Sequence, residues 1–254
     1  MLVATIIVVG AAIAAHLVNE AADAETDGRT QRTAFSGGSG ALAASHLTPA
    51  VPLTVGLGAA ALTAVATLMA WASGALPGPA ATILLVGLIG GLAYSLPPVA
   101  AMRRGWGEPL NAFLGGLLLP LAGVAAVLGS VGPADVLAFL PFTFVTLASV
   151  LATAWPDREA DAATGKRTLT VRLEPSRLRR LQGLAVAAFV VATLLSQLAG
   201  AMPLAVAGLV VLPLLLLGLA RFTRGGSALP NVVAMVGLIA LTDVILLVTL
   251  VSGA

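Results

Sequence analysis

Long apolar runs separated by short charged connections are the feature that most constrains the fold of this chain. There are eight such runs, each close to the roughly 20 residues that a helix needs to cross about 30 Å of hydrocarbon. They cover residues 2–18, 47–72, 80–101, 110–129, 134–154, 181–199, 203–220 and 230–252. Only 9% of the 254 residues are charged, whereas a soluble globular domain is about one quarter charged. The sequence therefore predicts an all-α, polytopic membrane helix bundle that forms one domain over residues 1–254.

The positive charges alternate between the two sides of this predicted bundle. All 13 Lys and Arg residues follow the first, third, fifth or seventh run, and the other connections contain none. Because positively charged connections stay on the cytoplasmic side, we predict a multi-pass protein of the cell membrane with these connections in the cytoplasm. Since topology accounts for the basic residues, they do not indicate nucleic acid as a partner.

The same alternation places Met1 on the outer side of the membrane. No basic residue precedes the first apolar run, although a secretory signal peptide has a basic leading region. We therefore interpret residues 2–18 as a membrane span, and we expect that the chain begins one helix late.

Two acidic clusters lie at the cytoplasmic ends of the first and fifth runs. Asn19, Asp23 and Asp27 are spaced four residues apart, as are Asp157 and Asp161, so each set shares one helical face. A cluster of this kind is often only a solvated helix end. However, carboxylates this close repel one another, and Mg²⁺ prefers such hard oxygen ligands in a shell that it shares with substrate phosphates. With no cysteine in the chain, thiolate chemistry is excluded. The clusters predict a magnesium–diphosphate site at the membrane surface.

Two long connections, residues 19–46 and 155–180, carry these clusters. We expect both to begin as helical extensions that hold the aspartates and then to return as a cap over the cytoplasmic mouth of the bundle. Residues 35–40 are too rich in glycine to continue a regular helix.

Four segments of the chain, residues 19–27, 32–40, 94–105 and 157–173, contain motifs in a recognisable order. Besides the two aspartate clusters, residues 161–173 contain Gly-Lys-Arg-Thr-Leu followed by Val-Arg-Leu, and residues 94–105 contain Tyr-Ser-Leu-Pro-Pro and Arg-Arg-Gly. Residues 32–40 read Arg-Thr-Ala-Phe-Ser-Gly-Gly-Ser-Gly. Together these segments resemble the UbiA superfamily of intramembrane prenyltransferases, and the last segment is similar to members of the 1,4-dihydroxy-2-naphthoate polyprenyltransferase type.

The resemblance implies a helix bundle, usually of nine transmembrane helices, around a central cavity. It implies transfer of a polyprenyl group from its diphosphate to an acceptor, with Mg²⁺ as the cofactor. The metal ligands, which are also the catalytic residues, would be Asp23, Asp27, Asp157 and Asp161. The substrate-binding residues would be Asn19, Tyr94, Arg103, Arg104, Lys166 and Arg167. In this scheme the cations neutralise the departing diphosphate, and the ring of Tyr94 faces the allylic cation.

The acceptor expected from these motifs is an aromatic quinone precursor. Lipid glycerol, haem and chlorophyll-type acceptors stay open, as do a non-catalytic or truncated paralogue and a lipid transporter. A transporter typically places ionisable residues in the middle of the membrane; here the ionisable groups concentrate at one surface, Asp243 in the middle of the last span is the exception, and no role is assigned to it. The expected partners are thus polyprenyl diphosphate, an aromatic or lipid acceptor, and membrane lipid.

Overall fold

The computed structural model describes residues 1–200 and 202–252, and in these residues every regular element is helical. Eight of the described helical segments are long and apolar enough to cross a membrane. They are α1 (Leu2–Asp27), α3 (Ala50–Ala72), α4 (Gly78–Ser95), the continuous segment α5–η2–α6 (Gly107–Leu128), α7 (Pro133–Ala154), α10 (Pro175–Ser196), α11 (Met202–Arg221) and α12 (Leu229–Ser252). The predicted all-α membrane bundle is confirmed.

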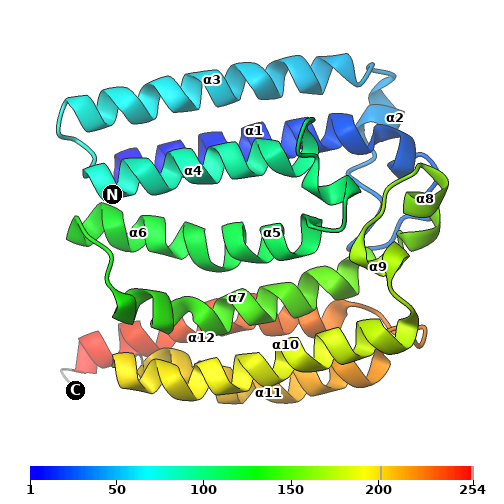
Figure 1. The fold of residues 1–254 in the computed structure, drawn as a ribbon. Helices are drawn as coiled ribbons and strands as arrows, with labels where there is room; N and C mark the ends of the chain where they lie inside the picture. The colour runs from blue at the N-terminus through cyan, green and yellow to red at the C-terminus, as the bar shows by residue number, and fades with distance from the viewer. Residues whose placement is uncertain (201, 253–254) are drawn as a thin grey trace.

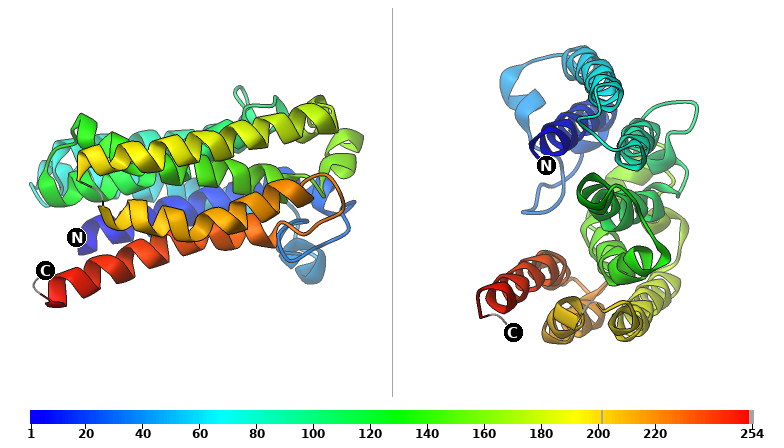
Figure 2. Two further views of the ribbon diagram at one scale, coloured as in Figure 1. Left: turned by 90° about the horizontal axis from the view of Figure 1, so that it is seen from below. Right: turned by 90° about the vertical axis from the view of Figure 1, so that its left-hand side faces the viewer.

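The long helices lie side by side and follow one another around an arc (Figures 1 and 2). Helix α1 packs against α3 and α4, the α5–η2–α6 segment lies between α4 and α7, and α7 packs against α10 and α12. Met1 and the last turns of α12 lie at one end of the bundle (Figure 1). The opposite end carries the short elements that build the site.

Two groups of side chains form the main apolar cores. In the C-terminal half, large side chains such as Phe189, Leu215 and Leu238 fill the space between α7, α10, α11 and α12. In the N-terminal half, α1, α4 and α6 meet through small buried residues such as Ala80 and Ala125. Small side chains allow helix backbones to approach closely where lipid supplies no hydrophobic driving force between them.

Proline sets two helix ends that apolarity alone misplaces. The apolar run 80–101 predicts a longer third span, but α4 ends at Ser95, because Leu96 is extended before Pro97 as residues preceding proline usually are. The sixth span begins at Pro175 rather than at residue 181, because proline is favourable in the first turn of a helix, where its missing N–H is not needed.

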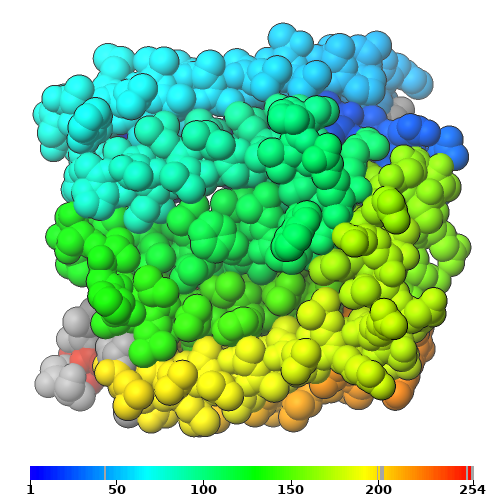
Figure 3. Space-filling view, in the orientation of Figure 1, coloured from blue at the N-terminus to red at the C-terminus, as the bar shows by residue number. Residues whose placement is uncertain are grey.

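Three short helices gather at the capped end of the bundle: α2 (Ala41–Ser45), α8 (Arg158–Ala163) and α9 (Leu169–Arg172) (Figure 1). In the space-filling view, the yellow-green α8–α9 segment covers this end beside the blue end of α1 (Figure 3). There are also two one-turn helices: η1 (Ala101–Arg103) comes between α4 and α5, and η3 (Gln197–Ala199) directly follows α10. The expected cap over one mouth of the bundle is present.

The first acidic cluster lies on a helical extension, as expected, because α1 continues to Asp27. For the second cluster that expectation is wrong. Helix α7 ends at Ala154, and a separate helix, α8, follows with Asp157 at its N-cap position. Pro156 explains the break, since it has no N–H to continue the helical hydrogen bonds. Asp157 and Asp161 are still one helical turn apart, because the Asp161 backbone N–H donates to the Asp157 carbonyl at 2.8 Å.

Candidate active site

The last turns of α1 present the first acidic cluster on one face. The amide of Asn19 donates to Asp23 Oδ2 at 3.1 Å. The same amide lies 3.3 Å from Ser95 Oγ and 3.4 Å from Met102 Sδ. Asn19 therefore joins the end of α1 to the end of α4 and to η1, and it orients the Asp23 carboxylate.

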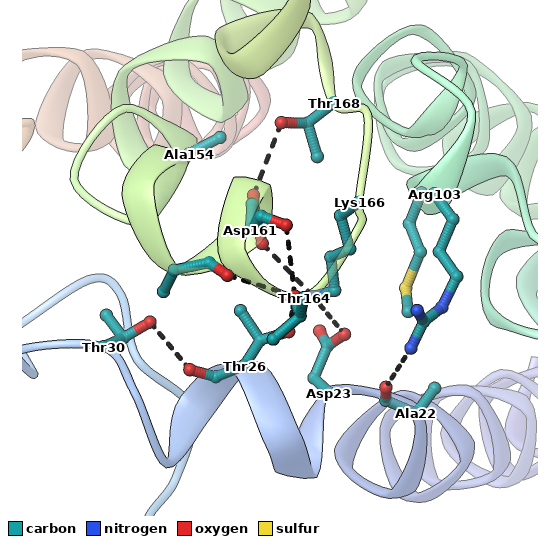
Figure 4. A network of polar contacts seen from close by, with 12 residues as sticks. Ala22, Asp23, Thr26, Thr30, Arg103, Ala154, Asp161, Thr164, Lys166 and Thr168 are labelled. Carbon is teal, nitrogen blue, oxygen red and sulfur yellow. Dashed lines mark hydrogen bonds and ion pairs between the residues drawn. The ribbon is translucent and has the colours of Figure 1, made fainter.

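Lys166 brings the two acidic clusters together (Figure 4). Its ammonium lies 2.5 Å from Asp23 Oδ1 and 3.4 Å from Asp161 Oδ1, and the residue is only 5% exposed. The local turn explains this position: Gly165 has a positive φ of 74°, which glycine adopts without steric cost at the end of a helix. The chain thus reverses after α8, and Lys166 returns toward Asp161.

Threonine hydroxyls add further links between α1 and the cap. The hydroxyls of Thr26 and Thr164 lie 3.0 Å apart, so α1 is hydrogen-bonded to the end of α8. Thr168 donates to Asp161 Oδ2 at 3.4 Å. These bonds fix the second acidic cluster beside the first.

The carboxylates of the cap are held in an unfavourable environment for negative charge. Burial, followed by the charge of Asp161, raises the pKa of Asp157 to about 6. Burial also raises the pKa of Asp161, against the opposing effect of Lys166. In addition, Asp157 Oδ1 is buried and has no hydrogen-bond partner within the described part of the chain. A cation bound here would lower the pKa of both aspartates and would give Asp157 Oδ1 a partner.

Two cavities meet at this end of the bundle. A small one of about 100 Å³ is lined by polar side chains that include Asp23, Asp157, Asp161 and Lys166. A larger one of about 310 Å³ runs between α1, α4 and α5–η2–α6, with a mainly apolar lining. Tyr94 lines both cavities. A ligand with a charged head and an apolar tail therefore fits the pair of cavities with its junction beside Tyr94.

The structure brings together only part of the set predicted from sequence. Asn19 lines the larger cavity, whereas Asp27 lines neither cavity. The guanidinium of Arg103 donates to the Ala22 carbonyl at 3.1 Å and thereby joins η1 to α1. The residues Arg104 and Arg167 are exposed and also line neither cavity.

Glu108 is a site residue that sequence reasoning missed. It lies in the first turn of α5, is 3% exposed, and lines the small cavity. Its Oε1 accepts the Leu169 amide N–H at 2.8 Å, while its Oε2 is buried without a partner among the described residues. The sequence feature that could have indicated Glu108 is an acidic residue at the start of an apolar span, where a charge is costly unless it has a functional partner.

The donors at this site suit a hard divalent cation that arrives with a phosphate-bearing substrate. Among the residues described, no three carboxylate or imidazole groups are close enough to hold a metal ion by themselves. Mg²⁺, however, usually takes one or two carboxylates and completes its shell with water and substrate phosphates. The unpartnered Asp157 Oδ1 and the neighbouring aspartates provide such oxygen ligands.

Comparison with known proteins agrees with this arrangement. The sequence model of the UbiA prenyltransferase family matches residues 1–248, a range that includes both acidic clusters. No curated protein and no solved structure matches the chain. Because the family match covers nearly the whole chain, this multi-pass membrane protein belongs to the UbiA prenyltransferase family, whose members transfer prenyl groups from a diphosphate to an acceptor within the membrane.

Proposed function

We propose that this protein transfers a polyprenyl group to an aromatic acceptor of the quinone-precursor type, in a Mg²⁺-dependent reaction at the cytoplasmic end of the bundle. The observation that carries the proposal is the joining of both acidic clusters by Lys166 at the mouth of an apolar cavity. Such a site offers charge compensation for a diphosphate and an apolar space for its chain.

The diphosphate end of the substrate is assigned to the small cavity. Asp23, Asp157 and Asp161 line this cavity. Together with Asp27, one turn after Asp23 on α1, they are the residues that would hold Mg²⁺, which would supply positive charge to the diphosphate oxygens and so make diphosphate a better leaving group. Lys166 adds a buried ammonium beside the same oxygens, where fixed positive charge stabilises the negative charge that develops on departure. The threonine links between α1 and α8 keep these groups in place.

The apolar part of the substrate is assigned to the larger cavity. When the allylic C–O bond breaks, its electron pair leaves with the diphosphate and a carbocation remains on the prenyl chain. The ring of Tyr94, which lines both cavities, stabilises this cation through its π face. A carbon of the acceptor ring then forms the new C–C bond. The ring regains its aromaticity when that carbon releases its proton to the departed diphosphate, or releases CO₂ where the carbon carries a carboxylate.

The aromatic acceptor is supported by the motifs at residues 32–40 and 161–173, which resemble those of naphthoate-type relatives. Purified protein in liposomes should be incubated with prenyl diphosphates and with naphthoate, hydroxybenzoate, glycerol phosphate and tetrapyrrole acceptors. We expect a prenylated aromatic product by mass spectrometry, with Mg²⁺ but not with EDTA. Prenylation of only the lipid or tetrapyrrole acceptor would contradict the acceptor assignment, and transport without diphosphate release would contradict catalysis.

The assignment of the site residues is tested by Asp23→Asn and Asp157→Asn, which keep the size of the side chain but remove its charge. We expect product formation to fall by at least about 100-fold in each, since each removes an interaction that is needed in the transition state. Glu25→Gln is the matched control, because Glu25 lies two residues from Asp23 but is exposed and paired with Arg29. Normal Mg²⁺-dependent turnover in both aspartate variants would overturn the assignment.

A further inference from the structure

Glu108 is a buried carboxylate that the proposed chemistry does not use. It is positioned by α5, whose first turn begins at Gly107, immediately after η1 and its connection. Glu108 differs from the exposed acids of the cap in two ways: it is only 3% exposed, and it lines the small cavity. A carboxylate in such a position is costly unless it has partners.

The two carboxylate oxygens of Glu108 have different surroundings. Oε1 accepts a hydrogen bond of 2.8 Å from the Leu169 amide, so the side chain is fixed relative to the segment that carries Lys166 and Thr168. Oε2 is buried without a hydrogen-bond partner in residues 1–200 and 202–252. A desolvated oxygen of this kind destabilises the protein until a donor or a cation reaches it.

The partner of Oε2 must therefore bring a hydrogen-bond donor or a positive charge. An ionised diphosphate brings neither, because its oxygens only accept hydrogen bonds, and the Mg²⁺ that accompanies it is assigned to the aspartates of the two clusters. The ammonium of Lys166 is already paired with Asp23 and Asp161. A hydroxyl group on the second substrate meets the requirement, and the cavity that Glu108 shares with Tyr94 is where that substrate must meet the prenyl carbon.

We propose that Glu108 binds the acceptor by accepting a hydrogen bond from a ring hydroxyl, and that it thereby selects hydroxylated aromatic acceptors. The inference rests on the proposed function, since it concerns the second substrate of that reaction. Its physical basis is a side chain that lines the small cavity and is fixed through Oε1 by the Leu169 amide, while its Oε2 is buried without a partner among the described residues. Such charge-assisted hydrogen bonds are about twice as strong as neutral ones.

The test uses Glu108→Gln in the full-length protein reconstituted in liposomes. Glutamine keeps an oxygen that accepts the Leu169 N–H, but it replaces the second oxygen with an NH₂ group that cannot accept a hydroxyl proton. We expect the KM for a hydroxylated acceptor, such as 1,4-dihydroxy-2-naphthoate, to rise by about 10- to 100-fold. The KM for the prenyl diphosphate and the Mg²⁺ concentration for half-maximal activity should change by less than about threefold.

A methylated acceptor provides a second readout that a purely structural role would not change. In the wild-type protein, the O-methyl ether of the same acceptor should inhibit weakly, because it has no hydroxyl proton to donate to Oε2. In Glu108→Gln, the preference for the hydroxyl compound over the ether should fall by about tenfold or more. Glu174→Gln is the matched control, since Glu174 is exposed at the start of α10 and lines neither cavity.

The outcomes separate this inference from the proposed function. If the wild-type protein prenylates no aromatic acceptor, the proposed function fails, and the inference fails with it. If the wild-type protein is active and Glu108→Gln leaves the acceptor KM and the ether preference unchanged, only the inference is overturned. A change in Mg²⁺ dependence or in binding of a non-reactive prenyl thiolodiphosphate, with unchanged acceptor KM, would also overturn it. Normal binding of that analogue shows that the variant is folded.

Discussion

At the scale of single residues, the site depends on which cation is turned inward. Lys166 and Arg167 are neighbours in the sequence, but Lys166 is buried between two aspartates, whereas Arg167 is exposed and bonds through its backbone N–H to the Arg103 carbonyl. The difference follows from the left-handed turn at Gly165, which determines the direction of the next side chain. Of the two, Lys166 is thus the cation whose position suits the proposed role beside the diphosphate.

Replacing Lys166 with methionine should separate this role from a general effect of charge. We expect prenyl transfer to fall by about 100-fold or more, because a buried donor beside the leaving group is lost. The melting temperature without divalent cations should also fall, since Asp23 and Asp161 lose their shared counter-charge. Activity assays and thermal unfolding in detergent measure the two effects. Arg167→Met is the control, and equal losses in the two variants would contradict the assignment.

The raised pKa of Asp157 predicts a pH dependence of stability. Its value is about 6 in the folded protein and 3.8 in the reference state, so the folded protein binds more protons between these values. The resulting stabilisation is present at low pH and is lost as the pH rises through about 6. Without divalent cations, we therefore expect a lower melting temperature at pH 7.5 than at pH 5, and Mg²⁺ should raise the melting temperature more at pH 7.5.

The variant Asp157→Asn should reduce this pH dependence, because its side chain does not titrate. Glu159→Gln, which changes an exposed acid on the same short helix, should leave the dependence in place. A melting temperature of the wild-type protein that rises from pH 5 to pH 7.5 in EDTA would contradict the role of Asp157.

At the scale of the helices, close backbone contact shapes the wall of the cavity. The π-helical turn η2 (Leu114–Leu118) lies within the fourth span, and a Cβ on its Gly116 would come within 2.6 Å of the Thr143 Cα in α7. Backbone atoms cannot move aside as a flexible side chain can. The glycine is therefore required for α7 to approach the segment that carries Glu108 and lines the larger cavity.

We predict that Gly116→Ala destabilises the protein by about 1–3 kcal/mol, the usual cost of overpacking a tight interface. Gly123→Ala is the matched control, because it lies in the same span and its Cβ would meet nothing within 4 Å; alanine there should be neutral or slightly stabilising. Unfolding by denaturant in mixed micelles compares the two. Equal stabilities would show that the contact between η2 and α7 is not tight in the membrane.

At the scale of the whole molecule, both acidic clusters lie at one end of the bundle (Figure 1). The positive-inside pattern predicts that this end faces the cytoplasm. Since the chain has no cysteine, single cysteines report on sidedness without background. Ala163, at the end of α8, and Ala75, between α3 and α4, are both exposed.

We expect a membrane-impermeant maleimide to label Ala75→Cys in intact cells and to label Ala163→Cys only after the membrane is opened. The reactive groups differ in position alone, so each variant controls for the other. Labelling of Ala163→Cys from outside would reverse the predicted orientation, and labelling of both from the same side would contradict the arrangement of the helices as membrane spans.

The sequence by itself determined the number of spans, the alternation of charge and the two acidic clusters. These features depend on local quantities: the free energy of transferring about 20 successive side chains into hydrocarbon, and residue spacing on a helix. Such quantities do not require knowledge of distant contacts. Apolarity alone places the helix ends near Pro97 and Pro175 wrongly by several residues. At Pro156 the fifth span ends where the sequence predicts, but the helical extension expected beyond it is a separate helix.

Only the tertiary structure decided which polar groups share a cavity. The pairing of Lys166 with Asp23 joins residues that are 143 positions apart, and the unpartnered oxygen of Glu108 becomes visible only when the cap segment is folded over α5. Burial and hydrogen bonding depend on packing between segments far apart in the chain, so the amino-acid sequence does not show them directly. For the same reason Arg104 and Arg167, which match the family motif as well as Lys166 does, lie outside both cavities.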